Sequence, residues 1–217
     1  MLRTVLACAA GLASTCSYGQ TVGSNGNRLR LSLAFDNSAT VLEDTFDRLT
    51  ISELSFGGHL AFQHESGFYG QLELESVDTY NVDLNGVGVD PDDSYRLRTI
   101  GLGFRTPRQG SRELFWGLGY RNGMSDEDGS EAADTVFVFW EKENVPRYGL
   151  VGVGLTTTDD SSVITVAGRH VWFGQSSVGV GLSWSIGGGR FDAPPGVTDP
   201  SIGVASIGVL MMFRPTL

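Results

Sequence analysis

Two nearby residues have the types needed for nucleophilic chemistry. His64 and Ser66 flank Glu65, and the carboxylates of Glu73 and Glu75 follow within the next predicted strand. A histidine that accepts the proton of a serine hydroxyl, and that a carboxylate orients, turns the serine into a nucleophile toward an ester. The candidates for catalysis are therefore His64, Ser66 and Glu75, with Glu73 as an alternative third member. A histidine beside a serine is also common by chance, so we assign no catalytic site from this pattern.

The sequence offers no other arrangement typical of an active site or a metal centre. The remaining histidines, His59 and His170, do not cluster with His64, and both cysteines, Cys8 and Cys16, precede residue 20. The chain after residue 19 therefore has no thiolate ligand and no disulfide. We predict no metal and no cofactor. With 15 basic and 25 acidic residues, the formal net charge is −10, which excludes nucleic acid as a partner because phosphates require the opposite sign.

A second set of titratable residues carries both signs of charge. We predict that they form a polar network inside the fold: His59, Glu73, Glu75, Arg105, Glu113, Arg121, Glu143, Arg147 and Arg169. Tight turns at 65–67, 107–111 and 144–146 would place members opposite one another: His59 with Glu73, Arg105 with Glu113, and Glu143 with Arg147. Opposite charges on neighbouring strands stabilise a sheet by about 0.2–1 kcal/mol per pair.

Arg96 and Arg98 do not fit this network, because they share the parity of the apolar residues Ile100 and Leu102. A bulge in the strand would resolve the conflict by turning the arginines inward. A position at the level of the lipid headgroups would resolve it without a bulge. The sequence does not choose between the two.

The N-terminus has the features of a targeting segment. Arg3 supplies a positive charge, an apolar stretch runs from Val5 to Ala13, and the small residues Ser17 and Gly19 suit cleavage before Gln20. We therefore predict a signal peptide over residues 1–19, Sec-type export with cleavage near Gly19, and one domain over residues 20–217. No later stretch has the ~20 apolar residues of a membrane helix.

Alternation of apolar and polar residues recurs along the rest of the chain and predicts an all-β fold. The predicted strands are 27–36, 49–64, 68–78, 93–106, 112–121, 134–143, 147–158, 162–172, 177–187 and 201–214. Connections after odd-numbered strands are mostly long (37–48, 79–92, 122–133 and 188–200), whereas those after even-numbered strands are tight. This asymmetry is typical of a closed, antiparallel, up-and-down transmembrane β-barrel with its short turns in the periplasm. We predict about ten strands, with eight as the alternative.

The two faces of the predicted strands differ in polarity. In the second strand, Leu54, Phe56, Leu60 and Phe62 share one face, opposite a polar face that includes His59. An apolar exterior and a polar interior suit a barrel in lipid, whereas a soluble sandwich would have the reverse. Aromatic residues collect near the short turns and predict a girdle at the membrane surface: Phe68, Phe104, Trp116, Trp140, Tyr148, Trp172, Phe173 and Phe213.

The last strand carries a recognisable spacing. Ser206, Gly208, Met211 and Phe213 follow the order polar, glycine, apolar, aromatic. This resembles the C-terminal β-signal that the outer-membrane assembly machinery of Gram-negative bacteria recognises, although Met211 stands where an aromatic is usual. The resemblance implies an outer-membrane β-barrel protein that meets the assembly machinery, outer-membrane lipid and lipopolysaccharide. It identifies no specific family.

Outer-membrane enzymes provide two further comparisons. The ten-stranded omptin proteases need an Asp-x-His dyad, and none of the three histidines has an aspartate two residues before it. His64-Glu65-Ser66 resembles the His-x-Ser of lipid A 3-O-deacylases, but it lies at a predicted periplasmic turn. We expect a structural or interaction role with a lumen largely plugged by side chains. The alternatives are a narrow, porin-like channel for small solutes and a lipid A-modifying hydrolase.

Overall fold

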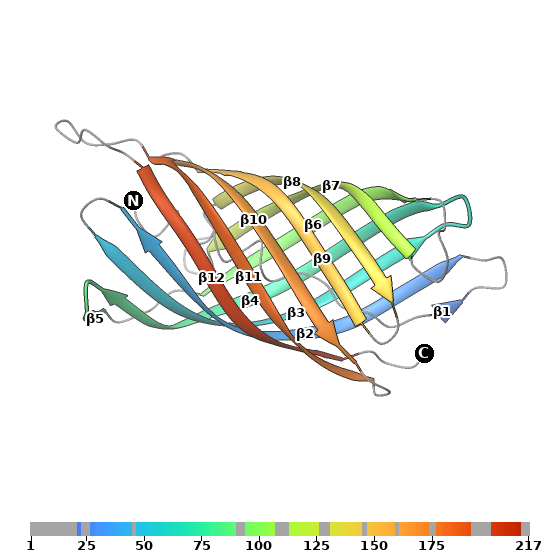
Figure 1. Ribbon diagram of the computed structural model, residues 1–217, viewed down its shortest axis with the longest axis horizontal. Coiled ribbons are helices and arrows are strands. Elements are labelled where there is room, and N and C mark those ends of the chain that lie inside the picture. Colours follow the sequence, from blue (N-terminus) through green and yellow to red (C-terminus); the bar gives the residue numbers. More distant parts are fainter. Residues whose placement is uncertain are drawn as a thin grey trace.

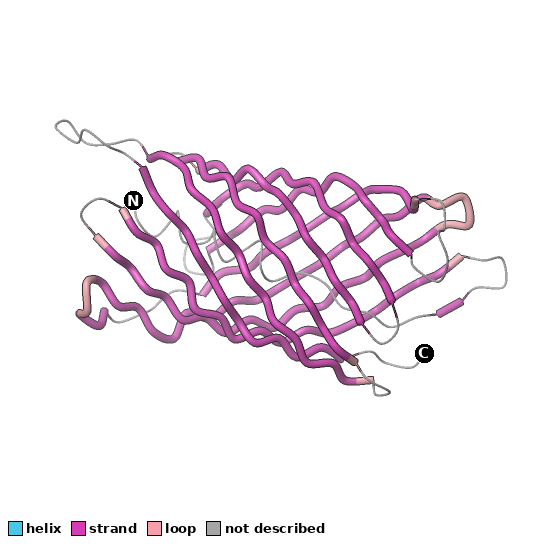
Figure 2. The backbone as a smooth tube through the Cα atoms, viewed as in Figure 1, coloured by secondary structure: helices cyan, strands magenta, loops and turns pink. Residues whose placement is uncertain are grey.

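The computed structural model describes residues 21–22, 27–44, 47–89, 94–106, 113–125, 131–144, 147–158, 161–173, 177–191 and 201–213. Figure 2 shows that the described backbone is almost entirely strand. None of the described residues belongs to a helix that is long and apolar enough to cross a membrane. The predicted signal peptide, residues 1–19, lies outside the described residues.

Ten long strands form one closed antiparallel barrel (Figure 1). They are β2 (Arg28–Glu43), β3 (Arg48–Gln63), β4 (Phe68–Leu84), β6 (Ser94–Arg105), β7 (Glu113–Ser125), β8 (Glu131–Asn144), β9 (Arg147–Thr157), β10 (Ser161–Trp172), β11 (Val178–Phe191) and β12 (Ser201–Phe213). Each strand pairs with the next along the barrel, and β2 also pairs with β12, which closes the sheet. Two short strands are added: β1 (Thr21–Val22) pairs with β2, and β5 (Val87–Val89) pairs with β4. The prediction of a ten-stranded all-β barrel is confirmed, and the eight-stranded alternative is wrong.

The strand register sets the tilt of the barrel wall. Following the paired residues once around the barrel from Arg28 on β2 leads back to Thr40 on the same strand, a stagger of twelve residues. A stagger of this size tilts the strands by about 40° from the barrel axis, and the tilt is visible in Figure 1. At ten strands, side chains are long enough to meet across much of the interior.

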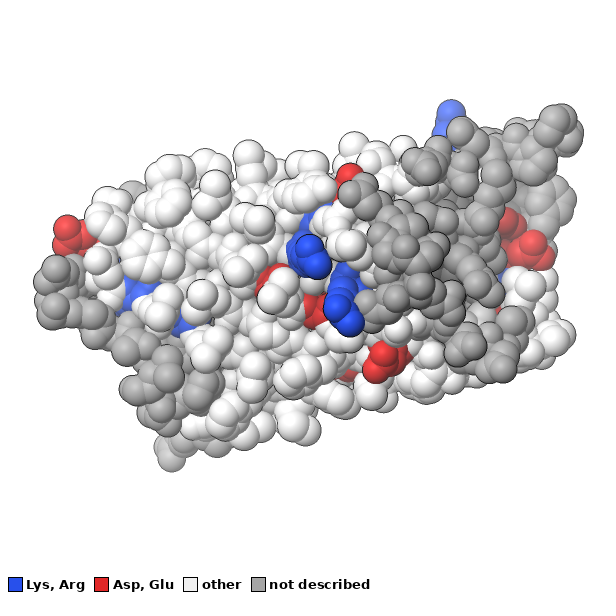
Figure 3. Space-filling view, turned by 180° about the vertical axis from the view of Figure 1, so that it is seen from behind, with Lys and Arg blue, Asp and Glu red and all other residues white. Residues whose placement is uncertain are grey.

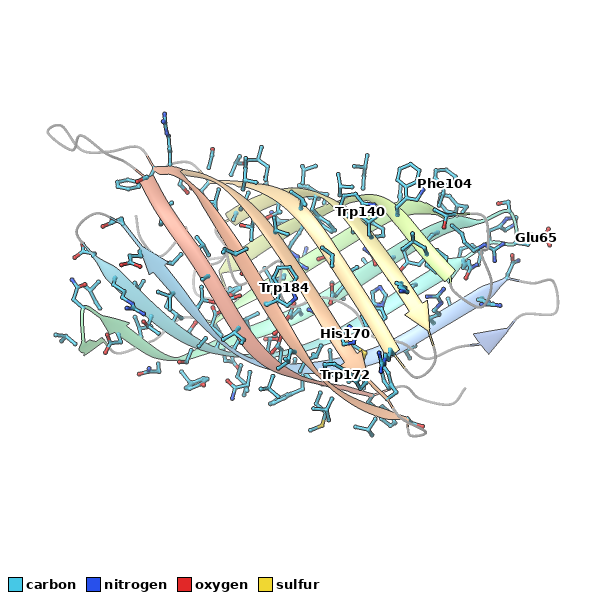
Figure 4. The ribbon with its side chains drawn as sticks, viewed as in Figure 1. Glu65, Phe104, Trp140, His170, Trp172 and Trp184 are labelled. Atoms are coloured by element: carbon cyan, nitrogen blue, oxygen red, sulfur yellow. The ribbon has the colours of Figure 1, made fainter. Side chains whose placement is uncertain are left out.

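Side chains alternate between the two faces as the sequence predicts. On β3, Phe56, Leu60 and Phe62 are exposed on the outside, whereas His59 and Gln63 are buried inside. The remaining long strands also place exposed apolar residues outside, and Figure 4 shows Phe104 and Trp140 on that outer surface. The predicted aromatic girdle needs one correction. Tyr148 and Phe173 are 1% and 4% exposed and point inward, because each alternates with an exposed neighbour on its strand.

The two ends of the barrel differ. We call the end with the β3–β4 turn, residues 64–67, the turn end; the first residue of β2 and the last residue of β12 also lie there. The opposite end carries the β4–β5 hairpin and is called the hairpin end. In that hairpin, Asn85 and Gly86 have φ angles of 54° and 85°, as a two-residue turn with left-handed backbone requires.

The long connections predicted at the hairpin end are largely strand. Residues 37–43 belong to β2, 79–84 to β4, 122–125 to β7 and 188–191 to β11. The outer face there mixes polar residues such as Asn37 and Glu43 with apolar ones, so the alternation in the sequence is weak. The inner face stays apolar, however, with Leu42, Leu49 and Ile51 packed together inside the barrel. This buried core explains why the strands continue where the outward apolar pattern is weak.

Candidate functional site

The barrel interior is where the charged side chains of this chain meet. Five predicted members of the polar network are buried there: His59, Glu73, Glu75, Arg121 and Arg169. The interior also holds charged residues that sequence reasoning missed: Arg30, Asp36, Glu53 and Glu141. These side chains and their apolar neighbours lie at successive levels along the barrel interior.

The layer nearest the turn end is centred on Arg30. Its guanidinium lies 3.3 Å from a carboxylate oxygen of Glu141 and donates to the Gln63 side-chain oxygen at 3.0 Å. The Tyr69 hydroxyl donates to the other Glu141 oxygen at 2.8 Å, and the guanidinium lies over the Phe115 ring at 4.9 Å. We call these five residues the turn-end layer. Arg30 and Glu141 are both 0% exposed, so the pair is held out of water, where charge-assisted hydrogen bonds are strongest.

Apolar side chains pack around the turn-end layer. They include Phe137, Phe139, Leu150, Val171 and Met212, all buried in one cluster with Tyr69 and Phe115. Inward-facing glycines make room for the rings. A Cβ on Gly117 or Gly119 would overlap the Phe139 or Phe137 ring, respectively. The missing side chains on β7 therefore let large rings from β8 occupy the lumen.

A second polar layer crosses the middle of the barrel. One nitrogen of His59 lies 3.2 Å from the Gln71 side-chain oxygen. Arg121 donates to the Thr99 hydroxyl at 2.8 Å and lies 3.8 Å from a Glu73 carboxylate oxygen. We call these five residues the mid-barrel layer. His59 and Glu73 are direct partners in the β3–β4 register, as the tight-turn argument predicts.

Acidic residues continue toward the hairpin end. The buried carboxylate of Asp36 has Arg169 as its opposite charge. Glu53 accepts a hydrogen bond from the Tyr95 hydroxyl at 2.7 Å and lies within electrostatic range of Glu75 and Asp36. Beyond these residues comes the hairpin-end cluster of buried apolar side chains, formed by Leu42, Leu49, Ile51, Val163, Ile202 and Val204.

Two of the predicted cross-strand pairs are wrong. Arg105 is opposite Phe115 and not Glu113, because the connection between β6 and β7 is two residues longer than the assumed symmetric turn. Glu143 is opposite Tyr148, which places Arg147 opposite Asn144. A one-residue slip of register moves a side chain to the other face. The side chains of Glu113 and Glu143 lie outside the described residues.

Two predicted members of the polar network consequently have different surroundings from those expected. Arg147 is exposed on the outer face of β9, and Arg105 is only partly buried near the turn end. A three-residue turn at 144–146 would place the Arg147 side chain inside the barrel, opposite Glu143. The strands run through Asn144 and resume at Arg147, so only two residues separate them and the parity is reversed.

The catalytic candidates do not form a triad. His64 Nδ1 lies 2.8 Å from the Ser66 hydroxyl, and the Ser66 backbone N–H donates to the same nitrogen at 3.2 Å. These contacts lie within the exposed β3–β4 turn, and Figure 4 shows Glu65 of this turn beyond the ends of the strands. Glu75 is buried far along β4, opposite Gly57 and Leu97. Glu73 lies in the mid-barrel layer, so neither carboxylate can orient His64.

The C-terminal motif divides between the two faces of β12. Ser206 and Gly208 point inward, whereas Met211 and Phe213 are 53% and 44% exposed on the outside. A Cβ on Gly208 would approach the side chains of Asp36 and Ser183 inside the barrel. The motif therefore places a glycine close to polar side chains inside the barrel and two apolar side chains on the outer wall.

Among the described residues, no group of three or more His, Cys, Asp or Glu side chains is arranged to hold a metal ion.

The sequence matches no protein-family model, and no curated protein matches it. Solved structures with a similar fold include the β-domain of the Bordetella autotransporter BrkA, at 12% identity and a TM-score of 0.43, with 92% of this chain and 96% of that one covered. The translocator domain of the autotransporter NalP from Neisseria meningitidis is 11% identical with a TM-score of 0.43, and 98% and 94% are covered. Neisserial surface protein A is 10% identical with a TM-score of 0.36, and 85% and 97% are covered. At these values, none of them bears on what this chain binds or does.

The buried Arg30–Glu141 pair can be tested with a double-mutant cycle. Arg30→Leu or Glu141→Leu alone leaves one charge buried without its partner, and we expect each to lower the free energy of unfolding by about 3–5 kcal/mol. The double variant strands no charge and should lose much less than the sum of the two. The measurement is urea unfolding in lipid vesicles, followed by tryptophan fluorescence.

Arg147→Leu is the matched control for that cycle, because Arg147 is exposed on the outer face. It should change the stability little. Additive losses in the cycle, or an equal loss in the control, would show that the Arg30–Glu141 contact does not stabilise the barrel.

Proposed function

We propose that this chain is a small barrel of the Gram-negative outer membrane with a structural or interaction role, and that its own side chains close its lumen. The observation that supports the proposal is the set of large side chains buried inside the barrel. The turn-end layer and its aromatic neighbours occupy one half of the lumen, and the hairpin-end cluster occupies the other end. A passage for water would have to cross both apolar regions and the mid-barrel layer between them.

The outer wall supports the membrane placement. Exposed large apolar residues occur on all ten long strands, among them Phe56, Leu118, Val136, Ile186 and Ile207, each at least 56% exposed. A contiguous exposed apolar surface of this extent is unusual on a soluble monomer. A closed barrel satisfies its backbone hydrogen bonds internally, so it can present this surface to lipid.

The orientation follows from the even number of strands. The described chain enters and leaves the barrel at the turn end. We propose that the turn end faces the periplasm, that the hairpin end faces outward, and that export removes the signal peptide near Gly19. Outer-membrane lipid and the assembly machinery are then the partners that the barrel meets.

A narrow cation channel is the second candidate, and the balance of interior charge favours it. Among the described buried residues, the interior carboxylates are those of Asp36, Glu53, Glu73, Glu75 and Glu141, whereas the guanidiniums are those of Arg30, Arg121 and Arg169. An acidic excess attracts small cations and repels anions. Any water path through this lumen should therefore be cation-selective.

Conductance of the refolded protein in planar bilayers tests the closed lumen. Wild type should show no steady conductance. The triple variant Arg30→Gly/Tyr69→Gly/Phe139→Gly removes much of the turn-end filling, so it should give more frequent or larger cation-selective openings.

Folding of both proteins is checked first by heat-modifiable migration in gels. Steady cation-selective conductance of the wild type would reject the closed lumen and support the narrow channel. A folded triple variant as silent as the wild type would mean that the turn-end layer is not a barrier to ions.

We also propose that β12 is the segment recognised during assembly. Phe213→Ala should lower the amount of barrel in the outer membrane several-fold and leave degraded precursor in the periplasm. The measurement is immunoblotting of membrane and periplasmic fractions. Phe104→Ala is the control, because Phe104 is also an exposed aromatic of the outer wall, 55% against 44% for Phe213. Equal effects of the two substitutions would mean that Phe213 contributes only general surface hydrophobicity.

A further inference from the structure

Four neighbouring strands interrupt the apolar outer wall with polar side chains. On β4, Ser76 and Asp78 follow Leu74 on the exposed face and separate it from Tyr80. On β6, Arg96 and Arg98 precede the apolar residues of the same face. The same change occurs on β7 at Asn122 and on β8 at Asp134.

The strand register places these residues side by side. Arg98 pairs with Leu74 on one side and with Asn122 on the other, and Arg96 pairs with Ser76. Asn122 in turn pairs with Asp134. Figure 3 shows one group of blue and red side chains near the middle of this face, with further charged side chains toward the two ends of the barrel. This region marks where the apolar belt ends on the side of the hairpin end.

Arg96 and Arg98 both point outward, since β6 runs through this region with unbroken alternation of exposed and buried residues. The shared parity of the two arginines with the apolar residues of β6 is therefore real, because no bulge turns the arginines inward. An arginine on the lipid face of a barrel costs about 2–4 kcal/mol at the bilayer midplane but only about 0–1 near the interfaces. The pair is therefore stable only at the level of the headgroups, which is where the belt ends.

The two arginines form one binding surface. Residues two apart on a strand share a face and lie about 7 Å apart, which allows both guanidiniums to reach one anionic group. Each guanidinium presents a planar fork of donors that matches the oxygens of a phosphate.

A hollow in the wall adjoins the arginines. It has a volume of about 570 Å³, and its lining includes Phe56, Gly58, Leu74 and Ser76, both arginines, and one carboxylate residue, Glu75. Gly58 faces outward between larger side chains, and only Leu33 would come near a Cβ there, at 3.8 Å. The missing side chain leaves an apolar depression that opens toward two cations. This combination matches an acyl chain joined to a phosphorylated headgroup.

Glu75 is buried inside the barrel wall at the hollow, whereas two other nearby carboxylates, Asp134 and Asp78, do not line it. Asp134 accepts hydrogen bonds from the Tyr120 hydroxyl at 2.6 Å and from the Asn122 amide at 3.0 Å. Asp78 is opposite Ser94, two pairs further toward the hairpin end than Arg96. Two exposed guanidiniums against one buried carboxylate leave the hollow with an excess of positive charge.

We propose that Arg96 and Arg98 bind a phosphate of the lipid A headgroup of lipopolysaccharide, with an acyl chain in the hollow between Phe56 and Leu74. This rests on the proposed orientation, in which the hairpin end faces the outer leaflet. The occupant is lipopolysaccharide because the site combines paired cations with an apolar depression at the headgroup level of that leaflet.

The test measures binding of purified lipopolysaccharide to the refolded, delipidated barrel by native mass spectrometry in detergent. Parallel samples use dephosphorylated lipopolysaccharide, phosphatidylglycerol and inorganic phosphate. The variant is Arg96→Gln/Arg98→Gln. The control is Arg48→Gln/Arg190→Gln, which removes the same charge from two exposed outward positions near the hairpin end. Heat-modifiable migration verifies that each protein is folded.

Wild type and control should retain lipopolysaccharide, and the Arg96/Arg98 variant should bind it at least about tenfold more weakly, as expected from the loss of two charge-assisted contacts. Dephosphorylated lipopolysaccharide should bind to wild type as weakly as intact lipopolysaccharide binds to the variant. Inorganic phosphate should not compete at equal concentration.

Equal binding by wild type and variant, or an equal loss in the control, overturns the site. Equal affinity for phosphatidylglycerol overturns the choice of lipopolysaccharide, and competition by inorganic phosphate overturns the role of the hollow. Each of these failures leaves the conductance result untouched, so it is distinguishable from failure of the proposed closed barrel.

Discussion

Backbone pairing between β2 and β12 is the constraint on which the rest of the molecule depends. Because β2 bonds to β12 as well as to β3, every long strand has two neighbours and the sheet has no free edge. A sheet without edges can carry apolar side chains over its whole outer face without exposing unpaired backbone groups to hydrocarbon. The charged side chains that point inward, such as Arg30 and Glu141, must then find their partners within the chain itself.

Inside the barrel, charged side chains are paired and aromatic rings are packed beside them. Arg30 meets Glu141, Gln63 and Tyr69, and Arg121 meets Glu73 and Thr99. Inward glycines on β7 provide space for the rings that surround the first of these groups. Packing and charge pairing thus depend on each other, since a ring that leaves its place would let water reach the charges and weaken their attraction. The acidic excess among the buried side chains fixes the sign of ion that a leak would admit.

The sequence predicts the faces of this barrel better than its register. Alternation within a strand is local, so His59, Glu73, Arg121 and Arg169 could be assigned to the interior from their neighbours alone. Pairing across a turn also requires the length of the turn, and one residue of error between β8 and β9 placed Arg147 on the wrong face.

Physical reasons also explain why the sequence did not reveal some of the buried residues and strand ends. Glu141 follows the stretch Val136-Phe137-Val138-Phe139, where both faces are apolar and no alternation marks the inside. Strand ends at the hairpin end were missed because the outer face mixes polar and apolar residues there while the inner face remains a core. The direction of Arg96 and Arg98 could be assigned only once the structure showed that β6 has no bulge.

The apolar face of the strands, which a soluble protein would bury in its core, is the face that contacts lipid in this barrel. All four tryptophans in the sequence, Trp116, Trp140, Trp172 and Trp184, lie on the outer face and are 37–46% exposed. The most direct measurement is fluorescence quenching of single-tryptophan variants, folded into vesicles that contain lipids brominated along the acyl chain. Lipid contact predicts strong quenching of each tryptophan by bromine and little by aqueous iodide. Emission that bromine leaves unchanged would contradict an apolar face in contact with lipid.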